Sequence, residues 1–300
     1  MKVYFNDDYV ASPQEFTTTR KSAKVAEALH SERTVKLVDP NQSVALEVLE
    51  ELVLNTHTRE YIRALQTGVP ESLATSSSFA WGPSTYRFAL AHSHGVVAAV
   101  GAVLGGDNRA GTLSSGLHHA RPEMGLGFCT LNGIAIGAAH ALALGHQVVI
   151  LDFDAHFGGG TFAHLVNLNK GTQPHVIQID VSVSKFDDYA PYGPHYRAFV
   201  SCGDSTDRLY LAAIEEALSY GDSLNMNDAI VIYNAGVDPV NGVQFDDPVD
   251  TMLRRDQMVA EWVGQRPAIF TLAGGYTTGF TLDDIVNMHI GTVRSWASAT

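Results

Sequence analysis

The chain has 300 residues, 45% of them apolar, which suits one large α/β domain or two small ones. Its formal net charge of −13 argues against a nucleic-acid partner, because phosphates call for basic patches, and its two cysteines are too few for a disulfide framework. The N-terminal sequence has no signal-peptide pattern, and no apolar run reaches the roughly 20 residues that cross a bilayer, so we expect a cytoplasmic protein without membrane contact.

The local amino-acid composition predicts where the long loops lie along the chain. Segments rich in Gly, Pro and Ser are expected to be long loops, at 67–84, 105–116 and 189–204. Apolar elements resume directly after each of them, and no repeat or low-complexity tract is visible. We therefore predict a single domain over residues 1–300.

Strands and helices are predicted to alternate in the second half of the chain. Four short apolar runs have the character of buried strands, at 148–154, 175–181, 229–236 and 268–275. Helix-like segments precede or separate them, at 130–145, 207–220, 249–263 and 279–297. This alternation predicts an α/β fold with a mainly parallel central sheet and helices on both faces. In such sheets ligands bind beyond the carboxyl ends of the strands.

The first candidate site residues are adjacent histidines, His118 and His119, in the segment GLHHARPEMGLGFC. Two histidines can divide the roles of acid and base, because a different partner can tune the pKa of each ring. A structural or surface pair is the alternative. Gly127 and Phe128 could form an apolar wall beside the site, although Phe128 could equally belong to the core.

The string DFDAHFGGG places Asp152, Asp154 and His156 in alternation where a strand runs out into a glycine-rich turn, so their side chains point the same way. A carboxylate and an imidazole two residues apart suit Zn²⁺. Only two of the three groups can easily reach one ion, so Asp152 is predicted to orient a neighbouring histidine. The alternative is that these polar residues only end a strand and cap the next helix.

Two further strand ends carry candidates. Asp238, in NAGVDPV, precedes a proline and could be a turn residue, but a catalytic zinc needs three protein ligands and the first string supplies two. Tyr276, in AGGYTTG, could donate a hydrogen bond to a developing oxyanion or be an ordinary packed tyrosine. The glycines before it, Gly275 among them, indicate close approach of the backbone to a ligand or only a turn.

In this order, the motifs HHA, GFC, DxDxH, AGxD and GGY resemble the histone deacetylase superfamily, which includes bacterial deacetylase-like amidohydrolases and acetylpolyamine amidohydrolases. The similarity runs from about residue 85 to 280. It implies the three-layer arginase/deacetylase fold. It also implies a zinc-dependent hydrolase that cleaves an acyl amide to a free amine and a short carboxylic acid.

The resemblance also implies roles position by position. One Zn²⁺ ion per chain would be held by Asp154, His156 and Asp238. The other matching positions imply a catalytic and substrate-binding set: His119 as general base, His118 as its electrostatic or acid partner, Asp152 behind His118, Tyr276 on the scissile carbonyl, Gly127 and Phe128 as the wall of an acyl-lysine tunnel, and Gly275 beside the substrate.

The chain departs from the family pattern beside these residues. Phe157 replaces a second histidine, and Gly159 stands where a polar residue behind His119 is expected, which could change the basicity of His119. A structural K⁺ ion is also implied, although the serine expected near it is not evident around 175–181.

We predict that the substrate is an acylated amine: a lysine side chain, a polyamine or another small amide. An acidic surface could attract such a cationic molecule, although negative charge also simply keeps a protein soluble. The alternative is a non-catalytic, deacetylase-like protein that binds a metal or ligand, its activity lowered by the missing partner at Gly159. A homo-oligomer also fits the resemblance, because in acetylpolyamine amidohydrolases a partner subunit narrows the entrance.

Overall fold

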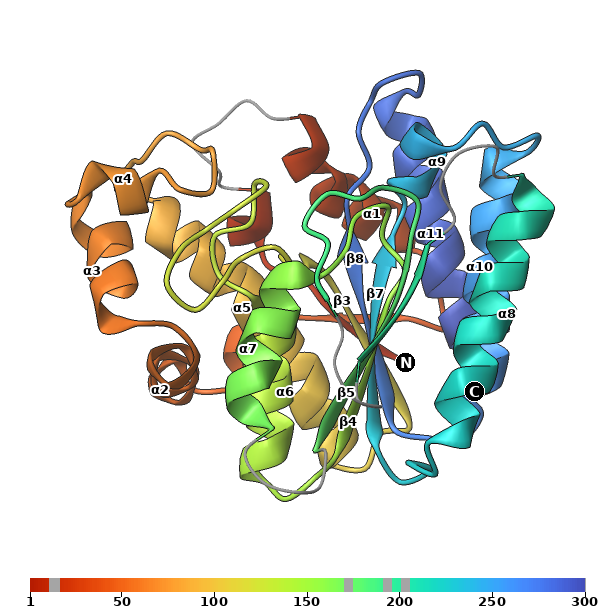
Figure 1. Ribbon diagram of the computed structural model, residues 1–300, viewed down its shortest axis with the longest axis horizontal. Coiled ribbons are helices and arrows are strands. Elements are labelled where there is room, and N and C mark those ends of the chain that lie inside the picture. The colour runs from red at the N-terminus through yellow and green to blue at the C-terminus, as the bar shows by residue number, and fades with distance from the viewer. Residues whose placement is uncertain (11–16, 170–174, 191–195, 201–205, 300) are drawn as a thin grey trace.

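The computed structural model describes residues 1–10, 17–169, 175–190, 196–200 and 206–299. Within these residues, eight strands form one sheet in the order β2-β1-β3-β8-β7-β4-β5-β6, and every neighbouring pair is parallel (Figure 1). The strands are β1 (Lys2–Tyr4), β2 (Lys36–Val38), β3 (Arg109–Ser115), β4 (Val148–Asp152), β5 (Val176–Ser182), β6 (Tyr196–Val200), β7 (Ile230–Gly236) and β8 (Ala268–Ala273). The predicted parallel sheet is confirmed.

Helices cover both faces of the sheet and give the three predicted layers (Figure 1). They are α1 (Lys21–Leu29), α2 (Leu46–Thr56), α3 (Arg59–Thr67), α4 (Glu71–Ala74), α5 (Thr85–Leu104), α6 (Gly133–Ala143), α7 (Gly159–Leu168), α8 (Asp207–Ser223), α9 (Pro239–Gly242), α10 (Pro248–Val263) and α11 (Leu282–Ser298). On one face pack α1, α8, α10 and α11, and on the other α5, α6 and α7, with α2 and α3 outside them.

The four strands predicted from apolar runs are adjacent in the middle of the sheet, as β8, β7, β4 and β5. Alternate side chains of β4 enter opposite cores: Val149 and Leu151 on one face, Val148 and Ile150 on the other. Both faces are buried, which explains why β4 begins with four consecutive apolar residues rather than alternating apolar and polar ones.

The prediction of a loop at 105–116 is wrong, because β3 pairs there with β1 and β8. The strand is composed largely of small residues because its neighbours are close. A Cβ on Gly111 would stand 2.1 Å from the ring of Phe270. The other two predicted loops contain α4 and β6, while 191–195 and 201–204 lie outside the described residues.

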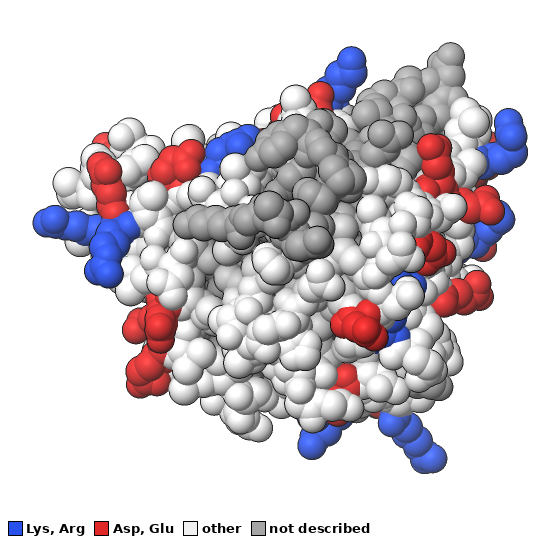
Figure 2. Space-filling view, turned by 60° about the horizontal axis from the view of Figure 1, so that its bottom comes forward, with Lys and Arg blue, Asp and Glu red and all other residues white. Residues whose placement is uncertain are grey.

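By length and composition, α5 could cross a membrane, but 72% of its most apolar stretch is buried inside the protein. It packs against β3 and α6 as a core helix. Figure 2 shows one face of the molecule, on which acidic side chains stand in several separate places and basic ones lie mostly near the outline. On this face the acidic excess is therefore spread out rather than gathered in one patch.

Candidate active site

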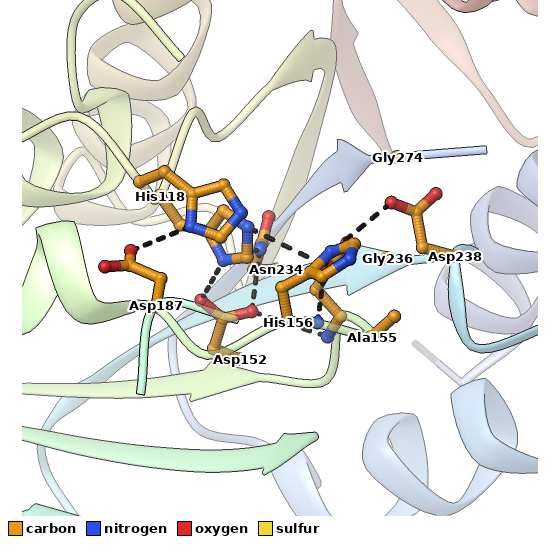
Figure 3. A network of polar contacts seen from close by, with 12 residues as sticks. His118, Asp152, Ala155, His156, Asp187, Asn234, Gly236, Asp238 and Gly274 are labelled. Carbon is orange, nitrogen blue, oxygen red and sulfur yellow. Dashed lines mark hydrogen bonds and ion pairs between the residues drawn. The ribbon is translucent and has the colours of Figure 1, made fainter. Parts of the chain in front are cut away.

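The polar residues predicted at strand ends meet at the carboxyl edge of the sheet (Figure 3). Asp154 and His156 follow β4, and Asp238 follows β7. These strands are neighbours in register, with Asp152 opposite Asn234, so both deliver the residues after them to one point. One ligand atom from each of Asp154, His156 and Asp238 lies within 4.8 Å of the other two.

Two buried carboxylates share one imidazole in this cluster. Nδ1 of His156 lies 3.1 Å from Oδ1 of Asp154 and 3.8 Å from Oδ2 of Asp238. Burial and repulsion by Asp154 raise the pKa of Asp238 to about 7, so a shared cation would stabilise the pair. Carboxylate oxygens and a ring nitrogen are a donor set that suits Zn²⁺, and the three residues fit one such ion.

Neighbouring backbone fixes both carboxylates. Oδ1 of Asp154 accepts from the N–H of His156 at 3.0 Å, and Oδ1 of Asp238 accepts from the N–H of Gly275. A Cβ on Gly236 would stand 2.3 Å from Oδ2 of Asp154, and one on Gly274 would stand 2.0 Å from Oδ1 of Asp238. The glycines of the AGxD and GGY motifs therefore make room for the two carboxylates of the candidate metal site.

His118 is held from behind by Asp152, as predicted: its Nδ1–H donates to Oδ2 over 2.7 Å. The other oxygen of Asp152 accepts from Nδ2 of Asn234 at 2.8 Å. Burial alone would lower the pKa of His118, but attraction by Asp152 and Asp154 outweighs burial and raises it to about 10. A cationic ring at this position can stabilise negative charge or donate a proton.

His119 has a carboxylate partner that the sequence pattern does not reveal. Its Nδ1–H donates over 2.8 Å to Oδ2 of Asp187, a residue in the segment after β5. Burial, together with the neighbouring charge of His118, lowers the pKa of His119 to about 4, although Asp187 opposes the shift. The expectation that Gly159 leaves His119 without a polar partner is therefore wrong. No motif could reveal Asp187, because only the fold brings it close.

A pocket of about 710 Å³, counted with its open mouth, unites most of the predicted residues. Its described lining includes Asp154, His156, Asp238, His118, His119, Gly127, Phe128 and Tyr276. The side chain of Phe128 is 38% exposed, so it belongs to the pocket wall rather than to the core. Gly275 is not among the described lining residues: it holds Asp238 from behind, and Gly274 lines the pocket.

Two more residues at the site carried no sequence signal. Phe186 packs edge-on against the rings of His119 and His156, with centroids 5.0 and 5.6 Å away. Lys21 is buried, lines the pocket, and donates from Nζ to the carbonyl of Gly274. Burial lowers the pKa of Lys21 to about 8, although Asp238 and Asp154 oppose the shift.

Sequence relatives match the chain over part of their length. The histone deacetylase domain family matches residues 15–293 of the chain. A probable deacetylase of Archaeoglobus fulgidus is 30% identical over 165 residues, 53% of this chain and 46% of that protein. Histone deacetylase 2 of Arabidopsis thaliana is 30% identical over 176 residues, 55% of this chain and 43% of that protein. The matched region thus spans less than half of either relative.

Two solved structures share the fold over nearly the whole chain. An acetylpolyamine aminohydrolase from Burkholderia pseudomallei superposes with a TM-score of 0.79 at 17% identity and covers 100% of this chain and 99% of its own. The HDA15 HD domain superposes with a TM-score of 0.76 at 20% identity and covers 99% and 90%. These likenesses confirm the arginase/deacetylase fold.

Proposed function

We propose, because this chain belongs to the histone deacetylase domain family, that it is a zinc-dependent hydrolase of acyl amides. The substrate would be an acylated lysine side chain, an acetylpolyamine or another small amide, and the products a free amine and a short carboxylic acid. One observation carries the proposal: Asp154, His156 and Asp238 converge in a pocket that also holds two histidines, each backed by a carboxylate.

Asp154, His156 and Asp238 would hold the zinc ion. When bound, zinc supplies Lewis acidity, which polarises an amide carbonyl and makes a water molecule more acidic. Asp238 keeps its orientation through the N–H of Gly275, and Asp154 through the N–H of His156. These backbone donors fix the ligands before any substrate arrives, so little reorganisation is needed during the reaction.

His119 is the proposed general base. Its Nδ1–H is committed to Asp187, which leaves Nε2 to take a proton from water as the water oxygen bonds to the amide carbon. Burial and the charge of His118 keep the pKa of His119 low, so the ring is neutral near pH 7 and able to accept that proton.

His118 and Tyr276 would complete the reaction. The cationic ring of His118, held by Asp152, offsets the negative charge that develops and protonates the leaving nitrogen as the C–N bond breaks. Burial raises the pKa of Tyr276 well above its usual value, so its phenol stays protonated and can donate to the oxyanion.

The pocket wall favours a slender substrate. Gly127 presents bare backbone beside the base, since a Cβ there would stand 2.8 Å from Cδ2 of His119. Phe128 adds aromatic surface to the pocket wall, and Phe186 adds it beside the ring of His119. An unbranched aliphatic amine, as in lysine or a polyamine, would fit between such walls.

Zinc content and turnover test the proposal. The purified, zinc-loaded chain should hold about one zinc ion and hydrolyse members of an acetyl-lysine and acetylpolyamine panel. His119→Ala should lower kcat by about 10²- to 10⁴-fold, and the exposed His30→Ala should not. Zinc without hydrolysis of any acyl amide would favour the non-catalytic alternative. Absence of zinc, or unchanged turnover in His119→Ala, would contradict the proposal.

Four expectations from the sequence stay predictions. They are a single domain, a cytoplasmic location, a homo-oligomer and a structural K⁺ ion. For the K⁺ ion, a serine does lie just after 175–181: Ser182, at the end of β5, donates at 2.6 Å to the carbonyl of Ala155, which lies between the proposed metal ligands Asp154 and His156. A cation-dependent change in melting temperature, K⁺ against Na⁺, would test the last of the four.

A further inference from the structure

The carboxylate of Asp187 occupies the space that a side chain at residue 159 would need. A Cβ on Gly159 would stand 2.3 Å from the carbonyl oxygen of Asp187 and 2.5 Å from its Oδ1. The side chain missing from the DxDxH segment is therefore matched by a carboxylate that reaches the same place from another part of the chain. A residue distant in sequence therefore places a carboxylate where residue 159 has no side chain.

Both oxygens of the Asp187 carboxylate accept hydrogen bonds. The Asp187 side chain has no exposed area. Oδ2 accepts from Nδ1 of His119 at 2.8 Å and from the N–H of Gly160 at 3.1 Å, and Oδ1 pairs with Arg121. The residue before α7, Gly158, has no side chain to cap the helix, so Asp187 takes the capping bond in the first turn.

The loop that carries Asp187 is fixed on both sides of it. The preceding carbonyl, of Phe186, accepts from the N–H of Phe157 at 3.1 Å, and Asp188 donates its N–H to Lys185 at 3.3 Å. Asp187 itself has a φ of +57°, a left-handed conformation that aspartate tolerates better than most residues. The carboxylate therefore has one orientation relative to α7 and His119.

We propose that Asp187 is the positioning residue for His119: it holds the ring with Nδ1 protonated and Nε2 towards the pocket, and Arg121 anchors it. The inference rests on the proposed function for its kinetic consequence, but not for its structural one. A carboxylate that accepts from Nδ1–H selects one of the two neutral tautomers of imidazole, whether or not the chain hydrolyses amides. Phe186, the adjacent residue, packs on the same ring, so one loop sets both the orientation of the base and the wall beside it.

The test combines ¹⁵N-histidine NMR with kinetics on the zinc-loaded chain. His119→Gln identifies the signals of His119. In the wild type these should be those of the Nδ1–H tautomer, and in Asp187→Asn they should shift towards the Nε2–H tautomer, because the amide can donate to Nδ1. For the same variant, kcat should fall about 10²- to 10³-fold while KM changes less than about 3-fold. The matched control is Asp188→Asn, an exposed neighbour in the same loop, which should change neither readout.

Arg121→Met gives a second, milder variant, because Asp187 stays in place and Arg121 is 30% exposed. It should lower kcat about 10-fold, and Arg121→Lys should restore most of the loss. Unchanged tautomer and kcat in Asp187→Asn would overturn the inference, and so would an unchanged kcat in Arg121→Met if Asp187→Asn does not fold. A tautomer shift in a chain that hydrolyses no acyl amide would instead support the inference and refute the proposed function.

Discussion

The two histidine–carboxylate pairs of the site have nearly the same geometry and opposite electrostatics. In the inner pair, His118 and Asp152 are joined over 2.7 Å; in the outer pair, His119 and Asp187 are joined over 2.8 Å. Yet the pKa of His118 is raised to about 10 and that of His119 lowered to about 4. A carboxylate at hydrogen-bond distance does not by itself decide whether its histidine is charged.

The pKa values of the two histidines differ because of the groups that surround each histidine–carboxylate pair. Asp152 shares its second oxygen with the neutral amide of Asn234, and His118 also lies 3.7 Å from Oδ1 of Asp154. Asp187 shares its second oxygen with the cation of Arg121. The ring of His119 lies 3.9 Å from that of His118, whose charge repels a second proton. One pair is therefore suited to give a proton and the other to take one.

Breaking the inner pair is expected to have the largest effect. Asp152→Asn removes the charge that most opposes burial of a cationic His118, so the pKa of that ring should fall from about 10 towards its usual range. The protonated form would then be lost at lower pH. We expect kcat to fall about 10²- to 10³-fold at pH 8 and the alkaline limb of the pH–rate profile to move to lower pH.

The control for this variant is Asp228→Asn, which removes an exposed carboxylate outside the site. A profile of Asp152→Asn that keeps the wild-type alkaline limb would show that Asp152 does not set the charge of His118. The comparison between the two pairs would then lose its physical basis.

The sequence could reveal the inner pair but not the outer one. Asp152, Asp154 and His156 alternate on one strand end, so their side chains point the same way. Because only two of the three can easily reach one ion, Asp152 is predicted to orient a histidine, and the family resemblance implies that this histidine is His118. Asp187 is tied to His119 only through the packing of the loop after β5 against α7. The glycine at 159 was visible as a departure from the family pattern, but a glycine does not say which residue fills its space.

The same contrast holds for the fold. Strands β4, β5, β7 and β8 are buried on both faces and are mostly apolar, so composition predicts them. Strand β3 is equally buried but consists largely of small and hydroxyl-bearing residues. Its place in the sheet depends on neighbours such as Phe270, which a local pattern does not contain.

Crowding the outer pair should have a smaller effect than breaking the inner one. In Gly159→Ala the new methyl group would meet the backbone oxygen of Asp187, so the loop must move. We expect a loss of roughly 1–3 kcal/mol in the free energy of unfolding and about a 10-fold fall in kcat. Urea unfolding and steady-state kinetics measure the two effects.

Gly291→Ala is the matched control, because its methyl group would be 3.7 Å from Leu253 and lies within α11. That variant should be neutral or slightly more stable, since alanine favours helix more than glycine does. Wild-type stability and turnover in Gly159→Ala would mean that the loop carrying Asp187 can move aside at no cost in free energy. Asp187 would then not be held where the outer pair needs it.

The smallest expected effect comes from His92, a buried pocket histidine that has no carboxylate partner among the described residues. Its Nε2–H donates to the carbonyl of Tyr9 at 3.1 Å, and its Nδ1 accepts from the N–H of Ser115 at 2.8 Å. Burial lowers its pKa to about 3, below the value of about 6.5 in an unfolded chain. The folded state therefore binds fewer protons than the unfolded state between these two values.

Stability from this group is fully present above about pH 6.5 and is lost as the pH falls towards 3. In the metal-free chain, the free energy of unfolding should decline between pH 6.5 and 4, and His92→Gln should make that decline less steep by up to about 1.4 kcal/mol per pH unit. Urea unfolding at several pH values measures both slopes. Equal slopes would mean that burial alone does not keep an imidazole neutral here. The low pKa of His119 would then have to come mainly from the charge of His118 rather than from burial, which would sharpen the contrast between the two pairs.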